Sequence, residues 1–247
     1  MCFKILKMAK VIIKIKDNGE RLVDIKKYCP GVKIRLDDRR MKVEKTAFVR
    51  EGVAKMLARA QKHLPVGWNF VIRDAWRPRF IQVHTYYAFI PMFKRQHPEW
   101  SKKRVLEEVN KYVADWQGER SSGHMTGGAI DLRLIDKRRR RVPMRSKKLS
   151  YQENAMPLCN KLPPALKKNR EIFFAVMKKA GFTPCHNEFW HWSYGDHRWA
   201  RIEAKKQAIY GVIDKNFYDR EPCPCGSGQK FAGCHGIAKR NLSKKLS

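Results

Sequence analysis

Apolar residues recur at helical spacing in some parts of the chain and alternate in others. The helical spacing occurs in residues 46–64, 80–93, 102–116 and 169–180. Pro65 follows the first of these segments as a stop signal, and Gly181 closes the last. Residues 68–72 and 129–135 alternate as strands do, and Pro78 restricts the preceding Arg77 to an extended conformation. The pattern therefore predicts an α+β fold in which helices separate the strands.

The two ends of the chain do not follow this pattern. The N-terminal stretch, MCFKILKMAKVIIKIKD, interrupts every apolar run with lysine, so it has neither a signal-peptide core nor a membrane span. It is more typical of a strand with lysines on its outer face. Near Tyr218 the pattern changes again, and EPCPCGSGQKFAGCHG is too short and too rich in glycine for a conventional core. We expect a main domain over residues 1–215, a small module over 219–237 and a basic tail over 238–247.

Composition adds the question of charge. The chain has 247 residues, of which 43% are apolar, enough for one packed domain and a small appendage. It carries 54 Lys and Arg against 23 Asp and Glu, a net charge of +31. Such a charge favours polyanions such as nucleic acid, or anionic membrane surfaces. The alternative is a set of solvated basic faces, since the cations are spread along the whole chain. The run KRRRR at 137–141 has the same two interpretations, a solvated hairpin turn or a polyanion site.

The cysteines indicate a reducing compartment. There are seven, an odd number, and three of them lie in the last thirty residues. This distribution is typical of intracellular thiols and a metal site, not of a disulfide framework. We therefore expect a cytoplasmic protein. The other four show no ligand spacing, although Cys185 is close to Glu188 in sequence; they are Cys2, Cys29, Cys159 and Cys185.

The stretch 121–132, SSGHMTGGAIDL, places His124 and Asp131 seven residues apart and leads into a predicted strand. It is either a tight turn with a paired core aspartate or a pair of ligands to one metal. The loop contains Gly127 and Gly128, which permit a tight path and the close approach of a substrate backbone. A catalytic zinc site needs three ligands of the His, Asp, Glu or Cys types, and a carboxylate that accepts a proton from water.

The segment Glu188-Phe189-Trp190-His191 offers the missing ligand and the base. On a regular strand Glu188 and His191 would point to opposite faces of the sheet. If both serve one metal, a twist, a bulge or a strand end must intervene. The alternative is that His191 is a core histidine among aromatic residues.

Together these residues resemble a known family. Ser122-x-His124-x-x-Gly127-x-Ala129-x-Asp131, followed by Glu188-x-Trp190-His191, is similar to the paired signature of the D-alanyl-D-alanine dipeptidases. These zinc peptidases are related to D,D-carboxypeptidases and to the hedgehog signalling domain. The similarity extends over about residues 20–200 and includes, in the family's order, REGVAKMLARAQKHLP, VIRDAWRP, NREIFFAVMKKAGF and EFWHWSYGDHRWA. It implies one zinc-peptidase domain with a central antiparallel sheet flanked by helices.

The resemblance also implies a role for each matching position. Three residues would ligate the catalytic Zn²⁺: His124, Asp131 and His191. Glu188 would activate the zinc-bound water and pass its proton to the leaving amine. Arg77 would stabilise the oxyanion on the scissile carbonyl, with Asp74 orienting its guanidinium. Ser122 would lie near the substrate carboxylate.

One segment departs from the family's pattern. Members usually carry a stretch like MGTPFDE, whose aspartate helps to hold the free amino group of the substrate. This chain has MRSKKLS at 144–150, with two lysines in that place, and Glu153 is a candidate substitute. The expected activity is zinc-dependent hydrolysis of D-Ala-D-Ala or related D-amino-acid dipeptides. The alternatives are a D,D-carboxypeptidase or L,D-muramyl-peptide hydrolase, which needs no acidic clamp, and a zinc-bound adaptor that acts through the C-terminal module.

The tail offers a second zinc site. Its four residues have the types and number of ligands of a closed structural site: Cys223, Cys225, Cys234 and His235. Metal binding would supply the stability that so short a segment lacks. The segment resembles the SEC-C motif, a small module that can bind a chaperone or the ribosome. With the 137–141 run and the basic end AKRNLSKKLS, it predicts a contact with RNA or a ribosome; unrelated cysteines in a disordered tail are the alternative.

Overall fold

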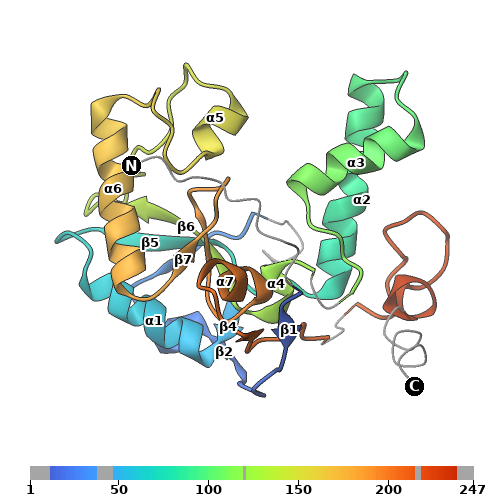
Figure 1. Ribbon diagram of the computed structural model, residues 1–247, viewed down its shortest axis with the longest axis horizontal. Helices are drawn as coiled ribbons and strands as arrows, with labels where there is room; N and C mark the ends of the chain where they lie inside the picture. Colours follow the sequence, from blue (N-terminus) through green and yellow to red (C-terminus); the bar gives the residue numbers. More distant parts are fainter. Residues whose placement is uncertain (1–11, 38–46, 119–120, 215–217, 238–247) are drawn as a thin grey trace.

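The computed structural model describes residues 12–37, 47–118, 121–214 and 218–237. A five-stranded sheet lies at its centre, with the strand order β3-β5-β6-β8-β7 (Figure 1). The strands are β3 (Lys33–Ile34), β5 (Asn69–Asp74), β6 (Ala129–Ile135), β7 (Thr183–Pro184) and β8 (His191–Ser193). All neighbours are antiparallel except β3 and β5, which are parallel. The fold is α+β as predicted, but the sheet is mixed because the chain crosses through a helix between β3 and β5.

Helices α1 (Glu51–Lys62) and α6 (Pro164–Lys179) contribute their apolar faces to the core of the sheet. Phe173 of α6 packs 6.4 Å from Phe70 and 5.3 Å from Trp192, measured between ring centroids. All three rings are fully buried, so they stabilise the helix–sheet layer. Helix α6 begins five residues before the predicted start because Pro164, in its first turn, suits a helix N-terminus.

The helix predicted from residue 46 begins later. Phe48–Arg50 forms β4, which pairs antiparallel with β2 (Leu22–Asp24), and helix α1 starts at Glu51. Val49 is fully buried in this ribbon. The buried side chain of Arg50 donates to the backbone oxygens of Thr126 (2.9 Å) and Gly211 (3.1 Å). These distant contacts override the local helical pattern. Residue 46 itself lies outside the described residues.

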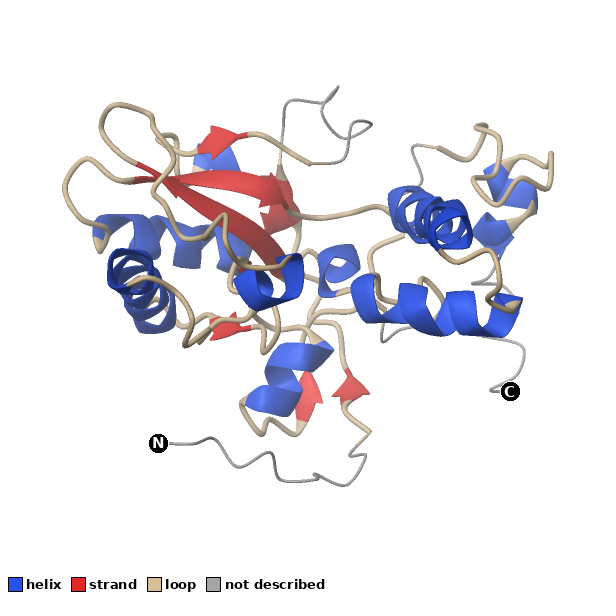
Figure 2. Ribbon diagram, turned by 90° about the horizontal axis from the view of Figure 1, so that it is seen from above, coloured by secondary structure: helices blue, strands red, loops and turns tan. Residues whose placement is uncertain are grey.

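Helices α2 (Arg79–Gln96) and α3 (Lys102–Tyr112) form a hairpin to one side of the sheet (Figure 2). Their seam is aromatic: Phe93 lies 5.4 Å from Tyr112 and 6.4 Å from Trp100, between ring centroids. Helix α3 ends four residues before the predicted limit, because Val113 is extended (φ −131°, ψ 123°). This early end leaves the backbone oxygens of Ala114 and Trp116 to accept hydrogen bonds from Gln82 and Arg79, both at 2.7 Å, at the start of α2.

The remaining elements are short. They are β1 (Lys14–Ile15), 3₁₀ helix η1 (Ile25–Lys27), α4 (Gly123–Thr126), α5 (Tyr151–Ala155), α7 (His197–Ile202), β9 (Gln207–Ala208), and the 3₁₀ helices η3 (Phe231–Gly233) and η4 (His235–Ile237). β1 pairs with β9, so the N-terminal strand is present at Lys14–Ile15, and the stretch 1–11 lies outside the described residues. The run 137–141 is an exposed turn at the end of β6, as its first interpretation predicted. Among the described residues, none of the helices has the length and apolar character needed to span a membrane.

The cysteine-rich module packs on helix α2 (Figure 1). Phe231 of the module is fully buried and meets Phe80 edge-on, with 5.2 Å between ring centroids. Tyr218, just before the module, stacks on the same ring at 4.7 Å. Phe231 and Cys223 therefore belong to one continuous apolar core with Phe80.

Candidate metal and catalytic centre

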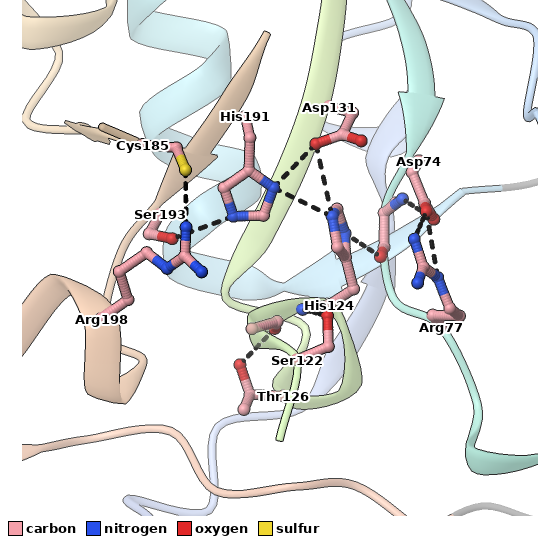
Figure 3. Close-up of polar contacts among 12 residues, drawn as sticks. Asp74, Arg77, Ser122, His124, Thr126, Asp131, Cys185, His191, Ser193 and Arg198 are labelled. Atoms are coloured by element: carbon pink, nitrogen blue, oxygen red, sulfur yellow. Dashed lines mark hydrogen bonds and ion pairs between the residues drawn. The ribbon is translucent and has the colours of Figure 1, made fainter. Parts of the chain in front are cut away.

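Three potential metal ligands converge at one end of the sheet (Figure 3). Nε2 of His124 lies 3.1 Å from Nδ1 of His191 and 3.3 Å from Oδ1 of Asp131. Nδ1 of His191 lies 2.9 Å from the same carboxylate oxygen. The three donor atoms thus form a nearly equilateral triangle, and both histidines are buried.

Different elements supply these residues. Asp131 and His191 are directly opposite each other on β6 and β8, so their side chains share one face of the sheet. His124 comes from the single-turn helix α4, and its Nδ1–H donates to the backbone oxygen of Ala75 at 2.9 Å. A carbonyl can only accept, so this bond fixes the tautomer and leaves Nε2 free to bind a metal.

The triangle fits Zn²⁺. A tetrahedral ion with bonds of about 2.0–2.1 Å requires donors about 3.3 Å apart, and the three observed separations are close to this value. Two imidazoles and one carboxylate are also donor types that zinc accepts. Three ligands leave one position of a tetrahedron for water or substrate, which is typical of a catalytic site and not of a structural one.

Glu188 lies in the turn before β8, where its backbone oxygen accepts from the N–H of His191 at 3.1 Å. Strand β8 begins only at His191, so the alternation of a strand does not separate the two side chains. Both line the same cavity. The strand end required by the sequence is therefore present.

The ionisable groups of the centre influence one another. Burial raises the pKa of Glu188, and the charge of Asp131 adds to this while His191 opposes it. Burial opposes ionisation of Asp131, but His124 and His191 outweigh it and hold the pKa of that carboxyl well below its usual range. Burial likewise opposes charge on His124, yet the carboxylates of Asp74 and Asp131 raise its pKa. Glu188 therefore binds a proton more readily than Asp131 does.

Arg77 lines the same cavity and is held from two sides. It forms an ion pair with Asp74, in which Nε donates at 3.1 Å. Its Nη1 donates to Oε1 of Gln82 at 2.7 Å, and Nε2 of Gln82 donates to the backbone oxygen of Ala114 at 2.7 Å. The orienting contact from Asp74 is therefore present, and Gln82 is a second positioning residue that the sequence did not reveal.

The cavity has a volume of about 320 Å³. Besides the residues named above, it is lined by Ser121, Ser122, Gly123, Asn187, His197, Arg198 and residues 110–114 of the α3 end. Arg198 was missed from the sequence, although it lies in the GDHRWA part of the family resemblance. Its Nη1 donates to Sγ of Cys185 at 2.6 Å, so that thiol contacts a cation of the cavity wall. The sequence does not indicate that the end of α3 lines the cavity, because its apolar residues are equally typical of a core.

The predicted role of Gly127 and Gly128 in the approach of a substrate backbone is wrong. A Cβ on Gly127 would lie 2.7 Å from Leu22, and one on Gly128 would lie 2.5 Å from the backbone oxygen of Tyr194. The two glycines therefore admit neighbouring segments of the protein itself, not a substrate backbone. Gly127 also has φ 71°, the left-handed conformation that glycine adopts at a helix end.

The two other substrate-binding candidates have local contacts. Oγ of Ser122 accepts from the N–H of His124 at 3.3 Å and caps α4, while the side chain still borders the cavity. The Glu153 carboxylate accepts from the N–H of Ser150 at 2.9 Å and pairs with Lys161 at 2.5 Å. Glu153 is therefore occupied by helix capping, and the cavity-lining carboxylates among the described residues are Asp131 and Glu188.

A second cluster of donors lies in the C-terminal module: Cys223, Cys225, Cys234 and His235. Nδ1 of His235 lies 3.0 Å from Sγ of Cys223 and 3.2 Å from Sγ of Cys234, and the Sγ atoms of Cys225 and Cys234 are 3.6 Å apart. Tetrahedral zinc with thiolate bonds of about 2.3 Å separates its ligands by about 3.5–3.8 Å, so a small expansion accommodates the ion. Nε2 of His235 lies 3.2 Å from the hydroxyl of Tyr87 on α2.

Comparison with known proteins identifies the family and the motif to which these two sites belong. The peptidase M15 family, described as D-ala-D-ala dipeptidase, matches residues 32–209. The chain belongs to this family. Members are zinc enzymes, so the protein is a metallopeptidase, and the triangle of donors lies within the matched region. The SEC-C motif, which binds zinc, matches residues 220–237 and contains the second cluster.

A curated relative supports the assignment. The D-alanyl-D-alanine dipeptidase of Synechocystis sp. is 25% identical over 195 residues, which cover 67% of this chain and 79% of the relative. The family, the enzyme class and the C-terminal motif predicted from the sequence are thus confirmed.

Proposed function

We propose that this M15 peptidase hydrolyses D-alanyl-D-alanine bonds, with zinc held by His124, Asp131 and His191. The observation that carries the proposal is the triangle of donors beside a cavity that also presents Glu188 and Arg77. When bound, Zn²⁺ supplies Lewis-acid chemistry: it polarises a carbonyl and lowers the pKa of water. The fold related to the hedgehog domain and the presence of one catalytic and one structural zinc ion are parts of the same proposal.

The side chains supply the proton transfers and the charge stabilisation. Glu188 accepts a proton from the attacking water and donates it to the leaving amine, a task suited to a carboxyl whose pKa burial has raised. Arg77 stabilises negative charge that develops on the scissile carbonyl oxygen, because its guanidinium is always protonated. Asp74 and Gln82 hold Arg77 in place before substrate arrives.

Asp74→Asn tests this positioning role. The amide keeps the size of the side chain but removes the charge that pairs with Arg77. We expect kcat to fall by about tenfold to a hundredfold, because a small displacement of a catalytic group has effects of this size, with little change in KM. Steady-state kinetics and the zinc content of the variant provide the measurement. A rise in KM of about tenfold to a hundredfold with an unchanged kcat would contradict the positioning role of Asp74.

The two ends of the substrate meet different environments. Arg198 and Lys111 line the cavity and offer positive charge to the carboxylate of a terminal D-alanine. A free ammonium finds no spare carboxylate among the described cavity residues, since Asp131 and Glu188 belong to the centre. The family description points to the free dipeptide, while this charge distribution favours a second candidate, an N-acylated peptide ending in D-Ala-D-Ala.

One assay separates these candidates. The full-length, zinc-loaded protein is incubated with D-Ala-D-Ala, with acetyl-D-Ala-D-Ala and with the L,L-dipeptide, and released alanine is measured. We expect D-alanine from the first two and none from the third, with higher kcat/KM for the acetylated peptide. No release from either D,D-peptide by protein with intact metal would contradict the function and favour an adaptor. Contact of the C-terminal module with RNA, a ribosome or a chaperone stays a prediction, testable by salt-sensitive binding.

A further inference from the structure

Arginines gather on the face of the sheet that carries the metal ligands. Arg133 follows Asp131 by two residues on β6, so the two side chains share that face. Arg73 lies at the bulge of β5, where Asp74 pairs with Asp131. Leu132, between Asp131 and Arg133, donates its N–H to the backbone oxygen of Trp190 at 3.0 Å, so Arg133 lies beside the segment that contains Trp190.

Arg145 has an environment unlike that of an ordinary surface cation. Its guanidinium carbon lies 4.5 Å from the ring centroid of Trp190, 5.6 Å from Phe189 and 5.8 Å from Tyr151. Such stacking fixes the plane of a guanidinium while the N–H groups at its edge still point outward. Trp190 stands between Glu188 and His191 in the sequence, so this fixed cation lies beside the catalytic centre.

The arginines on this face differ in their acidic partners within the described part of the chain. Arg73 forms an ion pair with Asp37. Neither Arg133 nor Arg145 makes an ion pair or a side-chain hydrogen bond with another described residue. The nearest negative charges, those of Asp131 beside Arg133 and Glu188 beside Arg145, belong to the metal and catalytic centre. The two guanidinium groups therefore repel each other without a carboxylate of their own. An anion bound between them would remove the repulsion.

The structure of the proposed substrate indicates which of its parts could supply such an anion. In a peptide that ends in D-Ala-D-Ala, the carboxyl end is fixed in length, and only the amino side can extend beyond the cavity. Arg145 lies at the cavity rim: it stacks on Tyr151, and Gln152, the next residue of α5, donates to the hydroxyl of the cavity residue Tyr112 at 2.9 Å. We propose that Arg133 and Arg145 bind an anionic group, a carboxylate or a phosphate, on the amino-side arm of the substrate. This inference rests on the proposed function and names the class of its substrate.

Matched peptides test the proposal on the full-length, zinc-loaded protein. One pair is acetyl-Glu-D-Ala-D-Ala and acetyl-Gln-D-Ala-D-Ala, and the other carries phosphoserine or serine in place of Glu or Gln. We expect kcat/KM to be at least about tenfold higher for the anionic member, the size expected for hydrogen bonds to a charged group. The pair with the larger ratio identifies carboxylate or phosphate as the preferred anion.

Variants test which arginines cause the preference for anionic peptides. Arg145→Gln and Arg133→Gln are expected to bring the ratio of kcat/KM for the anionic peptide to that for the neutral peptide close to one, without reducing the rate for the neutral peptide. Arg145→Lys keeps the charge but not the planar fork, so it retains part of the preference. Arg138→Gln removes one positive charge from the exposed turn and is expected to leave the ratio unchanged. A ratio near one in the wild type, or equal losses in Arg145→Gln and Arg138→Gln, would overturn the proposal.

Binding measurements keep the inference separate from the proposed function. Calorimetry on the full-length Glu188→Ala variant gives the affinity for each peptide without turnover. Tighter binding of the anionic peptides that is lost when Arg145→Gln is added supports the arginine site. If the wild type binds these peptides but hydrolyses none of them, only the proposed function is contradicted. Tighter binding of a single-stranded RNA 10-mer than of either anionic peptide, also lost with Arg145→Gln, would assign the surface to nucleic acid and overturn the proposal.

Discussion

Glu188→Gln is expected to slow D-alanine release by about 10²–10⁴-fold, the usual contribution of a general acid–base group, while the protein retains its zinc. The amide has nearly the same shape as the carboxylate but can neither accept the proton of the attacking water nor deliver it to the leaving amine. Glu188 is not one of the three converging donors, so its replacement leaves the proposed ligand set complete. The loss should appear in kcat, with KM little changed.

Two measurements decide this prediction: the rate of D-alanine release and the zinc content by atomic emission. Glu171→Gln is the matched control, because Glu171 is an exposed glutamate on α6, away from the cavity. It should retain the wild-type rate. If Glu188→Gln loses the catalytic zinc, the carboxylate is a ligand and the assignment is wrong. If the variant keeps both metal and rate, another group is the base.

Phe231→Ala is expected to lower the free energy of unfolding by about 3–5 kcal/mol, the usual cost of truncating a buried phenylalanine. The ring is fully buried against Phe80 near the start of α2. We also expect a fall in kcat, because Gln82 lies two residues farther along α2 and holds Arg77. The module is thus connected through a single helix to Arg77, the residue proposed to stabilise the oxyanion.

Denaturant unfolding and steady-state kinetics of the same preparation check this prediction. Phe231→Leu preserves most of the apolar volume and should lie between wild type and alanine in both measurements. Lys230→Ala, at the adjoining exposed position, is the control and should change neither. Two separate unfolding transitions with an unchanged kcat would show instead that residues 219–237 form an independent domain.

The parts predicted best from the sequence are those in which local pattern and chemistry agree. β6 has the predicted limits because its alternation continues without a break from Ala129 to Ile135. The donors His124, Asp131 and His191 converge as expected, since each sits in a short motif whose residue types suit one metal. A strand end next to Glu188 also follows from the sequence, because Glu188 and His191 can serve one metal only if the alternation of the strand is interrupted between them.

The failures arise where distant contacts determine the outcome. Residues 48–50 fit a helical pattern, but pairing with β2 and the long-range contacts of Arg50 make them a strand. The contact of Gln82 with Arg77 depends on the fold of a helix hairpin, for which no local signal exists. The glycines after His124 were assigned to substrate because the sequence does not show that Leu22 and Tyr194 occupy the neighbouring space.

The packing of the C-terminal module has a consequence for the biosynthesis of the protein. The ribosome completes residues 79–116, the α2–α3 hairpin, long before it makes Phe231 and His235, which contact this hairpin. Until then the ring of Phe80 lacks part of its cover, and α2 holds Arg77 without support from the module. A chain released before residue 231 would therefore carry every proposed catalytic residue but would lack the packing that supports the start of α2, and with it the contact of Gln82 with Arg77.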